Sequence, residues 1–136
     1  MLTGAESALA DAATDPGSLF KLVPTATGPD GYLLPETVAM SFANDLSSEQ
    51  VALITATQRP AAILGFAEPS GPPAWKGISA WAVIGTQDRI ITPGSQRQMA
   101  ERAKAAIVEV DASHVSMISK PDAVTDVIRK VASGVG

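Results

Sequence analysis

Residues 79–120 alternate between strand-like and helix-like sequence, and this alternation constrains the fold more than any other feature of the chain. Ala80–Ile84 is a continuous apolar run, and Ala106–Val110 is a second, mostly apolar run. Between them, Thr92-Pro93 offers an N-cap followed by a helix start. Two buried strands joined by a helix predict a parallel pair with a right-handed crossover.

The end of the chain predicts an amphipathic helix with Ser119 as its cap and Pro121 in its first turn. Apolar side chains recur there at the helical spacing i, i+3, i+4 and i+7: Val124, Val127, Ile128 and Val131. Residues 74–136 therefore predict a strand-helix-strand-helix unit of α/β class. A two-stranded sheet is marginal in water, so we expect either further strands upstream or a longer protein.

The first segment, residues 1–34, is expected to be irregular. It is rich in Ala, Gly, Pro, Thr and Asp, and its large apolar residues fall in short clumps. Pro16-Gly17, Gly28-Pro29 and Asp30-Gly31 are typical of turns.

The second segment, residues 35–73, predicts three short helices. The first starts at Pro35, the second at a capping box formed by Ser47 and Gln50, and the third after Pro60. A Pro- and Gly-rich hinge follows them. This order is typical of a lid, but it also fits a helical subdomain core, and the sequence leaves both interpretations open.

Composition excludes several classes of function. The 136 residues carry a net charge of −4 without a basic run, which argues against nucleic acid as a partner. The chain has no cysteine and one histidine, so we expect neither a thiolate nor a His-rich metal site, and no cofactor. It shows no signal-like N-terminus and no apolar run of about 20 residues. We expect a soluble protein, away from membranes and in the cytoplasm.

Asp88 and His114 are the candidate site residues. Each comes a few residues after a predicted strand, and the carboxyl ends of parallel strands meet at one edge of a sheet. An Asp–His hydrogen bond there would orient the imidazole and stabilise its protonated form. The alternatives are a solvated turn aspartate and a surface or capping histidine, and Asp111 is a competing acid three residues before His114.

Residues 35–132, most clearly 81–131, resemble the C-terminal half of α/β-hydrolase-fold proteins, in the branch that includes bacterial esterase-like enzymes with a small helical lid. The resemblance is carried by four stretches: Gly85-Thr-Gln-Asp-Arg, Ile91-Thr-Pro, Met99-Ala-Glu-Arg-Ala and Glu109-Val-Asp-Ala-Ser-His. It implies that Asp88 is the acid and His114 the base of a catalytic triad, with the nucleophile upstream.

No motif in this sequence supplies that nucleophile. No serine has Gly at both −2 and +2, as the G-x-S-x-G elbow requires; Ser70 precedes Gly71, but prolines flank the pair. The loop expected to hold an oxyanion is absent as well. The resemblance therefore implies the C-terminal part of a serine-type hydrolase of small ester or acyl substrates (carboxylic-ester-hydrolase-like), inactive alone. The alternative is a non-catalytic α/β module that binds a small ligand or associates with itself through an open sheet edge.

Four further side chains have a functional and a structural interpretation. Trp75, Trp81 and Met117 could line a substrate pocket or pack in the core, and Arg59 could meet a substrate carboxylate or remain solvated. We favour the structural interpretation for all four.

Overall fold

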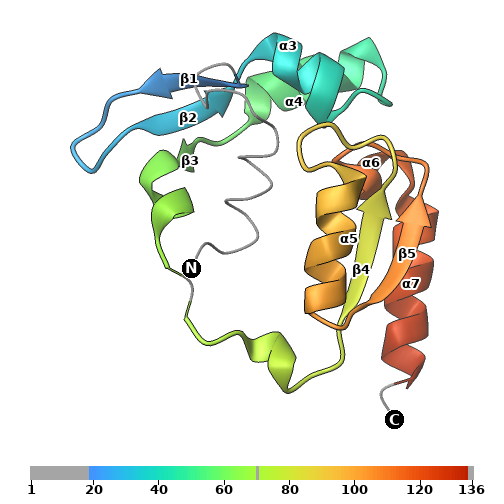
Figure 1. The fold of residues 1–136 in the computed structure, drawn as a ribbon. Helices are drawn as coiled ribbons and strands as arrows, with labels where there is room; N and C mark the ends of the chain where they lie inside the picture. Colours follow the sequence, from blue (N-terminus) through green and yellow to red (C-terminus); the bar gives the residue numbers. More distant parts are fainter. Residues whose placement is uncertain (1–18, 70, 135–136) are drawn as a thin grey trace.

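The computed structural model describes residues 19–69 and 71–134, which form a small antiparallel sheet with helices and a separate parallel α/β unit (Figure 1). The elements in chain order are β1 (Phe20–Val23), β2 (Asp30–Leu33), α3 (Pro35–Thr37), η1 (Val38–Phe42), α4 (Ser48–Thr57), β3 (Ala61–Ala62), η2 (Ile63–Ala67), η3 (Ala74–Lys76), β4 (Trp81–Gly85), α5 (Pro93–Arg102), β5 (Ala106–Val110), α6 (Ser116–Ser119) and α7 (Pro121–Gly134).

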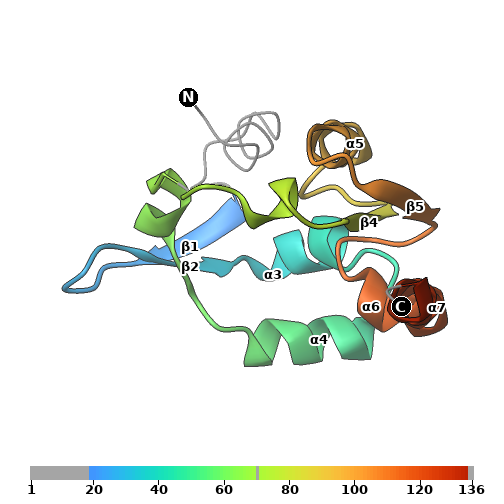
Figure 2. The same ribbon diagram turned by 90° about the horizontal axis from the view of Figure 1, so that it is seen from below.

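The C-terminal unit is built on the parallel pair β4 and β5. Their register runs from Trp81 opposite Ala106 to Gly85 opposite Val110. Helices α5 and α7 lie on opposite sides of this sheet (Figure 2). The predicted α/β class and the strand-helix-strand-helix order are confirmed.

Local signals place the helix starts of this unit. Thr92 caps α5 by accepting the Ser95 N–H at 3.3 Å, and Pro93 occupies the first turn. Pro121 opens α7 as expected, but the short helix α6 precedes it and ends at Ser119. Ile128 of α7 is 62% exposed, so the described residues cover the predicted apolar stripe incompletely.

Residues 34–57, which we call the cap segment, contain the first two predicted helices. Its first helix continues from α3 into a π-helical turn, η1, in which the Ala43 N–H donates to the Val38 carbonyl at 2.9 Å. The capping box before α4 is present: the Gln50 N–H donates to Ser47 Oγ at 3.3 Å, and the Ser47 N–H donates to Gln50 Oε1 at 3.2 Å.

The third predicted helix is wrong in type. After Pro60 the chain pairs briefly with β2 as β3 and then forms the 3₁₀ helix η2 in place of the expected α-helix. A short apolar run does not distinguish these forms, and the pairing of Ala61 with Gly31 and of Ala62 with Asp30 selects the extended one.

The expectation of irregular structure is also wrong for residues 20–33, which form the antiparallel hairpin β1–β2. Asp30-Gly31 lies within β2, and the turn falls at residues 25–28, where Gly28 has φ +116°. Gln58, directly after α4, holds the end of the hairpin. Its Oε1 accepts the Leu33 N–H at 2.8 Å, and its Nε2 donates to the Leu33 carbonyl at 3.0 Å. The predicted turn at Pro16-Gly17 lies outside the described residues.

A buried apolar cluster lies between the cap segment and the loop that carries His114. Val38, Ala43 and Val115 are buried together there. Partly buried side chains pack around them: Leu33, Phe42, Leu46, Val51 and Ile54. The cap segment thus contributes to the core of this chain. As domain boundaries, the divisions 1–34, 35–73 and 74–136 stay predictions.

Within residues 19–69 and 71–134, no helix combines the length and the apolar character needed to span a bilayer.

Candidate active site

Asp88 lies in the acid loop, residues 86–92, directly after β4. Its Oδ1 accepts the backbone N–H groups of Ile90 at 2.8 Å and Ile91 at 3.0 Å. Its Oδ2 accepts from Gln96 Nε2, on the first turns of α5, at 2.7 Å. Asp88 is only 5% exposed, and these donors compensate the cost of burying a carboxylate. The acid is therefore held in one orientation.

His114 lies in the His loop, residues 111–115, after β5. Its Nδ1 is 2.8 Å from Asp88 Oδ2, and its side chain is 29% exposed. An ionised carboxylate only accepts hydrogen bonds, so Nδ1 carries the proton in this contact. In the neutral imidazole Nε2 is then left as an acceptor. The Phe42 ring lies against the imidazole, with centroids 4.9 Å apart and planes at 38°. The predicted pair is thus brought together across 26 residues.

Backbone hydrogen bonds continue from β4 and β5 into the two loops. The Thr86 N–H donates to the Val110 carbonyl, and the Gln87 N–H donates to the Ala112 carbonyl, both at 2.9 Å. Asp111 accepts from Gln87 Nε2 at 3.1 Å. The structure therefore pairs His114 with Asp88, whereas the competing acid is engaged elsewhere.

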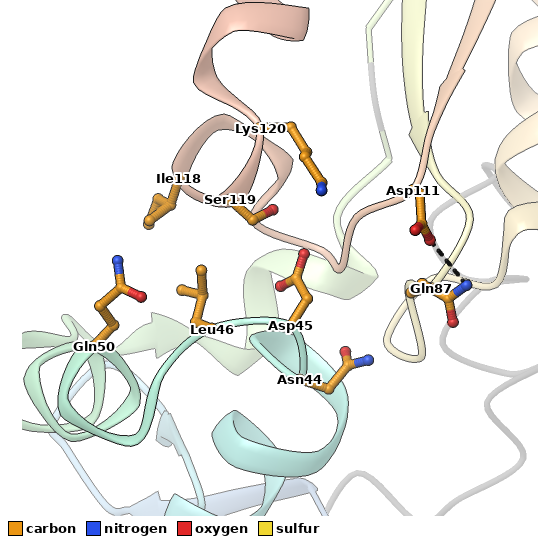
Figure 3. Close-up of a pocket in the computed structure, with 9 residues that line it drawn as sticks. All are labelled: Asn44, Asp45, Leu46, Gln50, Gln87, Asp111, Ile118, Ser119 and Lys120. Atoms are coloured by element: carbon orange, nitrogen blue, oxygen red, sulfur yellow. Dashed lines mark hydrogen bonds between the residues drawn. The ribbon is translucent and has the colours of Figure 1, made fainter.

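The cap segment contacts both loops. Arg89 Nη1 donates to the Met40 carbonyl at 3.1 Å, and Asp45 Oδ2 accepts the Ser113 N–H at 2.9 Å. Figure 3 shows Asp45 and Ser119 facing each other in a polar cavity of about 510 Å³.

The Asp45 carboxyl has a lowered pKa. Burial opposes its charge, but the Ser113 hydroxyl, the Ser119 hydroxyl and the Ser113 N–H outweigh this and hold the pKa below its ordinary range. The Ser119 hydroxyl is close enough to favour the charge without the geometry of a full hydrogen bond.

Sequence reasoning missed Gln96, Phe42 and Asp45. Gln96 follows Asp88 by eight residues in a polar helix, and no motif distinguishes it from its neighbours. Phe42 and Asp45 belong to a segment about 70 residues upstream of His114, and their role depends on how the cap segment packs.

Among the described residues, no hydrogen bond or ring contact joins the remaining candidates to Asp88 or His114. Trp81 begins β4 while Asp88 follows its end; with Trp75 it lines an apolar cavity of about 260 Å³ beside α5. Met117 and Arg59 are exposed. In the part of the chain that the structure describes, no three His, Asp or Glu side chains form a group that could hold a metal ion.

An aspartate and a histidine, hydrogen-bonded at the carboxyl ends of neighbouring parallel strands, are the acid and base arrangement of the α/β-hydrolase class. The model of the Alpha/beta hydrolase family matches residues 2–127 of this sequence. The chain belongs to that family. The catalytic role of Asp88 and His114 stays a prediction.

Solved structures of similar fold include two of one esterase. The crystal structure of polyneuridine aldehyde esterase superposes with a TM-score of 0.70 at 17% identity, covering 83% of this chain and 48% of that one. A mutant of the same esterase gives a TM-score of 0.69 at 17% identity, covering 82% and 47%. The chain therefore spans about half the length of these structures. No curated protein matches it.

Proposed function

We propose that this chain supplies the acid and the base of a serine-type hydrolase that acts on a small carboxylic ester. The observation that carries the proposal is the 2.8 Å contact between His114 Nδ1 and a buried Asp88 carboxylate. Membership of the α/β-hydrolase family and the likeness to an esterase support hydrolytic chemistry.

In the proposed reaction, His114 Nε2 takes the proton of a serine hydroxyl as the serine oxygen attacks the ester carbonyl. Asp88 stabilises the imidazolium and stays ionised. The imidazolium then gives its proton to the leaving alkoxide, which departs as the alcohol. Water then attacks the acyl-enzyme while the same nitrogen takes its proton. As the acid leaves, the imidazolium returns this proton to the serine oxygen, which restores the starting state.

We place the nucleophile outside these 136 residues, because no serine stands in a G-x-S-x-G elbow. The chain alone should then be inactive. In other serine hydrolases, loss of the nucleophile alone costs about 10⁶ in kcat.

Hydrolysis of p-nitrophenyl acetate and butyrate tests the proposal. The chain alone and its His114→Ala variant should both give the buffer rate, and a fluorophosphonate probe should label neither. In a protein that joins this chain to a nucleophile-bearing half, His114→Ala should lower kcat by about 10⁶ and Asp88→Asn by about 10⁴. Full activity of that His114→Ala variant would refute the proposal, and His114-dependent turnover by the chain alone would place the nucleophile within it.

A second candidate function is self-association through a strand edge. Among the described residues β4 and β5 pair only with each other, and Trp81 and Ile107 on them are 40% and 38% exposed. A lysine at either position should convert a dimer to a monomer in light scattering. Ile128→Lys, which removes exposed apolar surface from a helix, is the control and should leave the dimer intact.

The cytoplasm remains our proposed compartment. Fractionation of cells that produce the natural protein would check it, and recovery in the membrane or the medium would contradict it.

A further inference from the structure

Asp45 joins the cap segment to the backbone beside His114. It accepts the Ser113 N–H at 2.9 Å across 68 residues of sequence. Ser113 is 1% exposed, so water has little access to this N–H. A buried N–H that loses its acceptor costs more free energy than the hydrogen bond itself provides, so this contact is a strong local constraint.

The residues around His114 are constrained from two sides. On one side the Ala112 carbonyl accepts the Gln87 N–H at 2.9 Å, which ties the His loop to the acid loop. On the other side Asp45 accepts the Ser113 N–H. His114 follows immediately, and no side chain within the loop fixes its Cα comparably; the bond from the Val115 N–H to Ser113 Oγ is long, at 3.4 Å.

The same short segment also reaches the imidazole itself, because Phe42 lies against its face. Phe42 ends η1, and Asp45 follows three residues later. The segment from Phe42 to Asp45 therefore contacts both the imidazole ring and the backbone next to it.

We propose that Asp45 is a positioning residue for the base: by holding the Ser113 N–H, it keeps the His114 imidazole at hydrogen-bonding distance from Asp88. The inference rests on the proposed function only in calling His114 the base. The geometric claim concerns the chain alone and is tested without turnover.

The surroundings of Asp45 allow its side chain to be replaced without disturbing the packing around it. It borders the open polar cavity shown in Figure 3, so truncation leaves no sealed void. Asp111 and Lys120 are the other charged groups that line this cavity. Asparagine at position 45 keeps the shape and one acceptor oxygen but removes the charge, whereas alanine removes the acceptor.

The single histidine of the chain makes the readout specific, because every imidazole signal in a ¹⁵N NMR spectrum belongs to His114. Two quantities are measured at neutral to mildly alkaline pH: the solvent exchange rate of the Ser113 amide and the fraction of His114 in the Nδ1–H tautomer. Asp88→Asn provides the reference spectrum for the reversed tautomer, with the proton on Nε2. Asp122→Ala, which removes an exposed carboxylate from the first turn of α7, is the control.

In Asp45→Asn, the solvent exchange rate of the Ser113 amide should rise roughly fivefold. This factor corresponds to a loss of about 1 kcal/mol when a charge-assisted hydrogen bond becomes a neutral one. The fraction of His114 in the Nδ1–H tautomer should fall in parallel. Asp45→Ala should move the His114 signals most of the way to those of Asp88→Asn, and Asp122→Ala should change neither quantity. Faster Ser113 exchange in Asp45→Asn with unchanged His114 signals would overturn the proposal, even if Asp45→Ala fails to fold. A negative ester assay with these shifts present would count against the proposed function and not against this inference.

Discussion

At the scale of single residues, Gly85 allows the acid and His loops to approach each other. A Cβ on Gly85 would lie 2.5 Å from the Ser113 carbonyl oxygen and 2.6 Å from that of Ala112. Backbone atoms cannot yield as a flexible side chain can. The close packing of the acid and His loops therefore explains why position 85 is a glycine.

Gly85→Ala should destabilise the chain by about 1–3 kcal/mol, because the His loop must shift away from β4. Urea unfolding followed by circular dichroism would measure the change. Gly94→Ala is the matched control: its added Cβ meets nothing within 4 Å, and its helical position in α5 predicts equal or slightly higher stability. Equal midpoints for Gly85→Ala and the wild type would contradict the packing argument.

Asp88→Asn should reverse the His114 tautomer. The new amide donates where the carboxylate accepted, so Nδ1 must become the acceptor and the proton moves to Nε2. The amide NH₂ also faces the Gln96 Nε2 donor, which should cost about 1–3 kcal/mol of stability. Ring ¹⁵N shifts and urea unfolding check the two effects. Asp111→Asn, whose side chain bonds Gln87, should leave the tautomer unchanged.

At the scale of elements, helix α4 shows how a local signal and a tertiary contact combine. The Ser47–Gln50 capping box starts the helix, and Val51 and Ile54 then pack on the buried cluster of the cap segment. The capping box determines the residue at which the helix begins, while packing on the buried cluster determines which face of the helix is buried.

Ser47→Ala should therefore lower the free energy of unfolding by about 1 kcal/mol, through loss of the bond from the Gln50 N–H. Thermal or urea denaturation would detect it. Ser48→Ala, one residue later and inside the helix, should change stability by less than about 0.5 kcal/mol. An equally large loss of stability in Ser48→Ala would show that the effect of Ser47→Ala does not come from capping.

At the scale of the whole molecule, the cap segment and the C-terminal unit are joined through the site. Phe42 meets His114, Asp45 meets Ser113, and the Met40 carbonyl meets Arg89. Loss of these contacts would separate the two parts of the chain at the position where chemistry is proposed.

This junction should weaken in acid. The pKa of Asp45 is lowered in the folded chain, so its contribution to stability is fully present above the ordinary aspartate value of about 4 and is lost as pH falls through the lower folded value. The stability difference between wild type and Asp45→Asn should therefore shrink as pH falls below about 4. Urea unfolding across this range measures it, and a difference independent of pH would contradict the prediction.

Much of the fold was predictable because its signals are local. The apolar run before Gly85, the Thr92-Pro93 start and the Ser47 capping box each depend on a few neighbouring residues, and all three elements formed as expected. The pairing of Asp88 with His114 was also predictable, because parallel strands place their carboxyl ends at one edge.

The hairpin at residues 20–33 and the strand after Pro60 were not predictable, since their sequences are short and lack a period. They are extended because each pairs with a partner and because Gln58 bonds Leu33 from another segment.

By itself, the sequence determined the α/β alternation, the helix starts and the order of Asp88 and His114 along the chain, because backbone propensity and capping act between near neighbours. Only the tertiary structure decided that Asp45, Phe42 and Gln96 would surround the Asp88–His114 pair. The physical reason is that a hydrogen bond across 68 residues has no local signature: it forms where the burial of Val38, Ala43 and Val115 brings the two segments together.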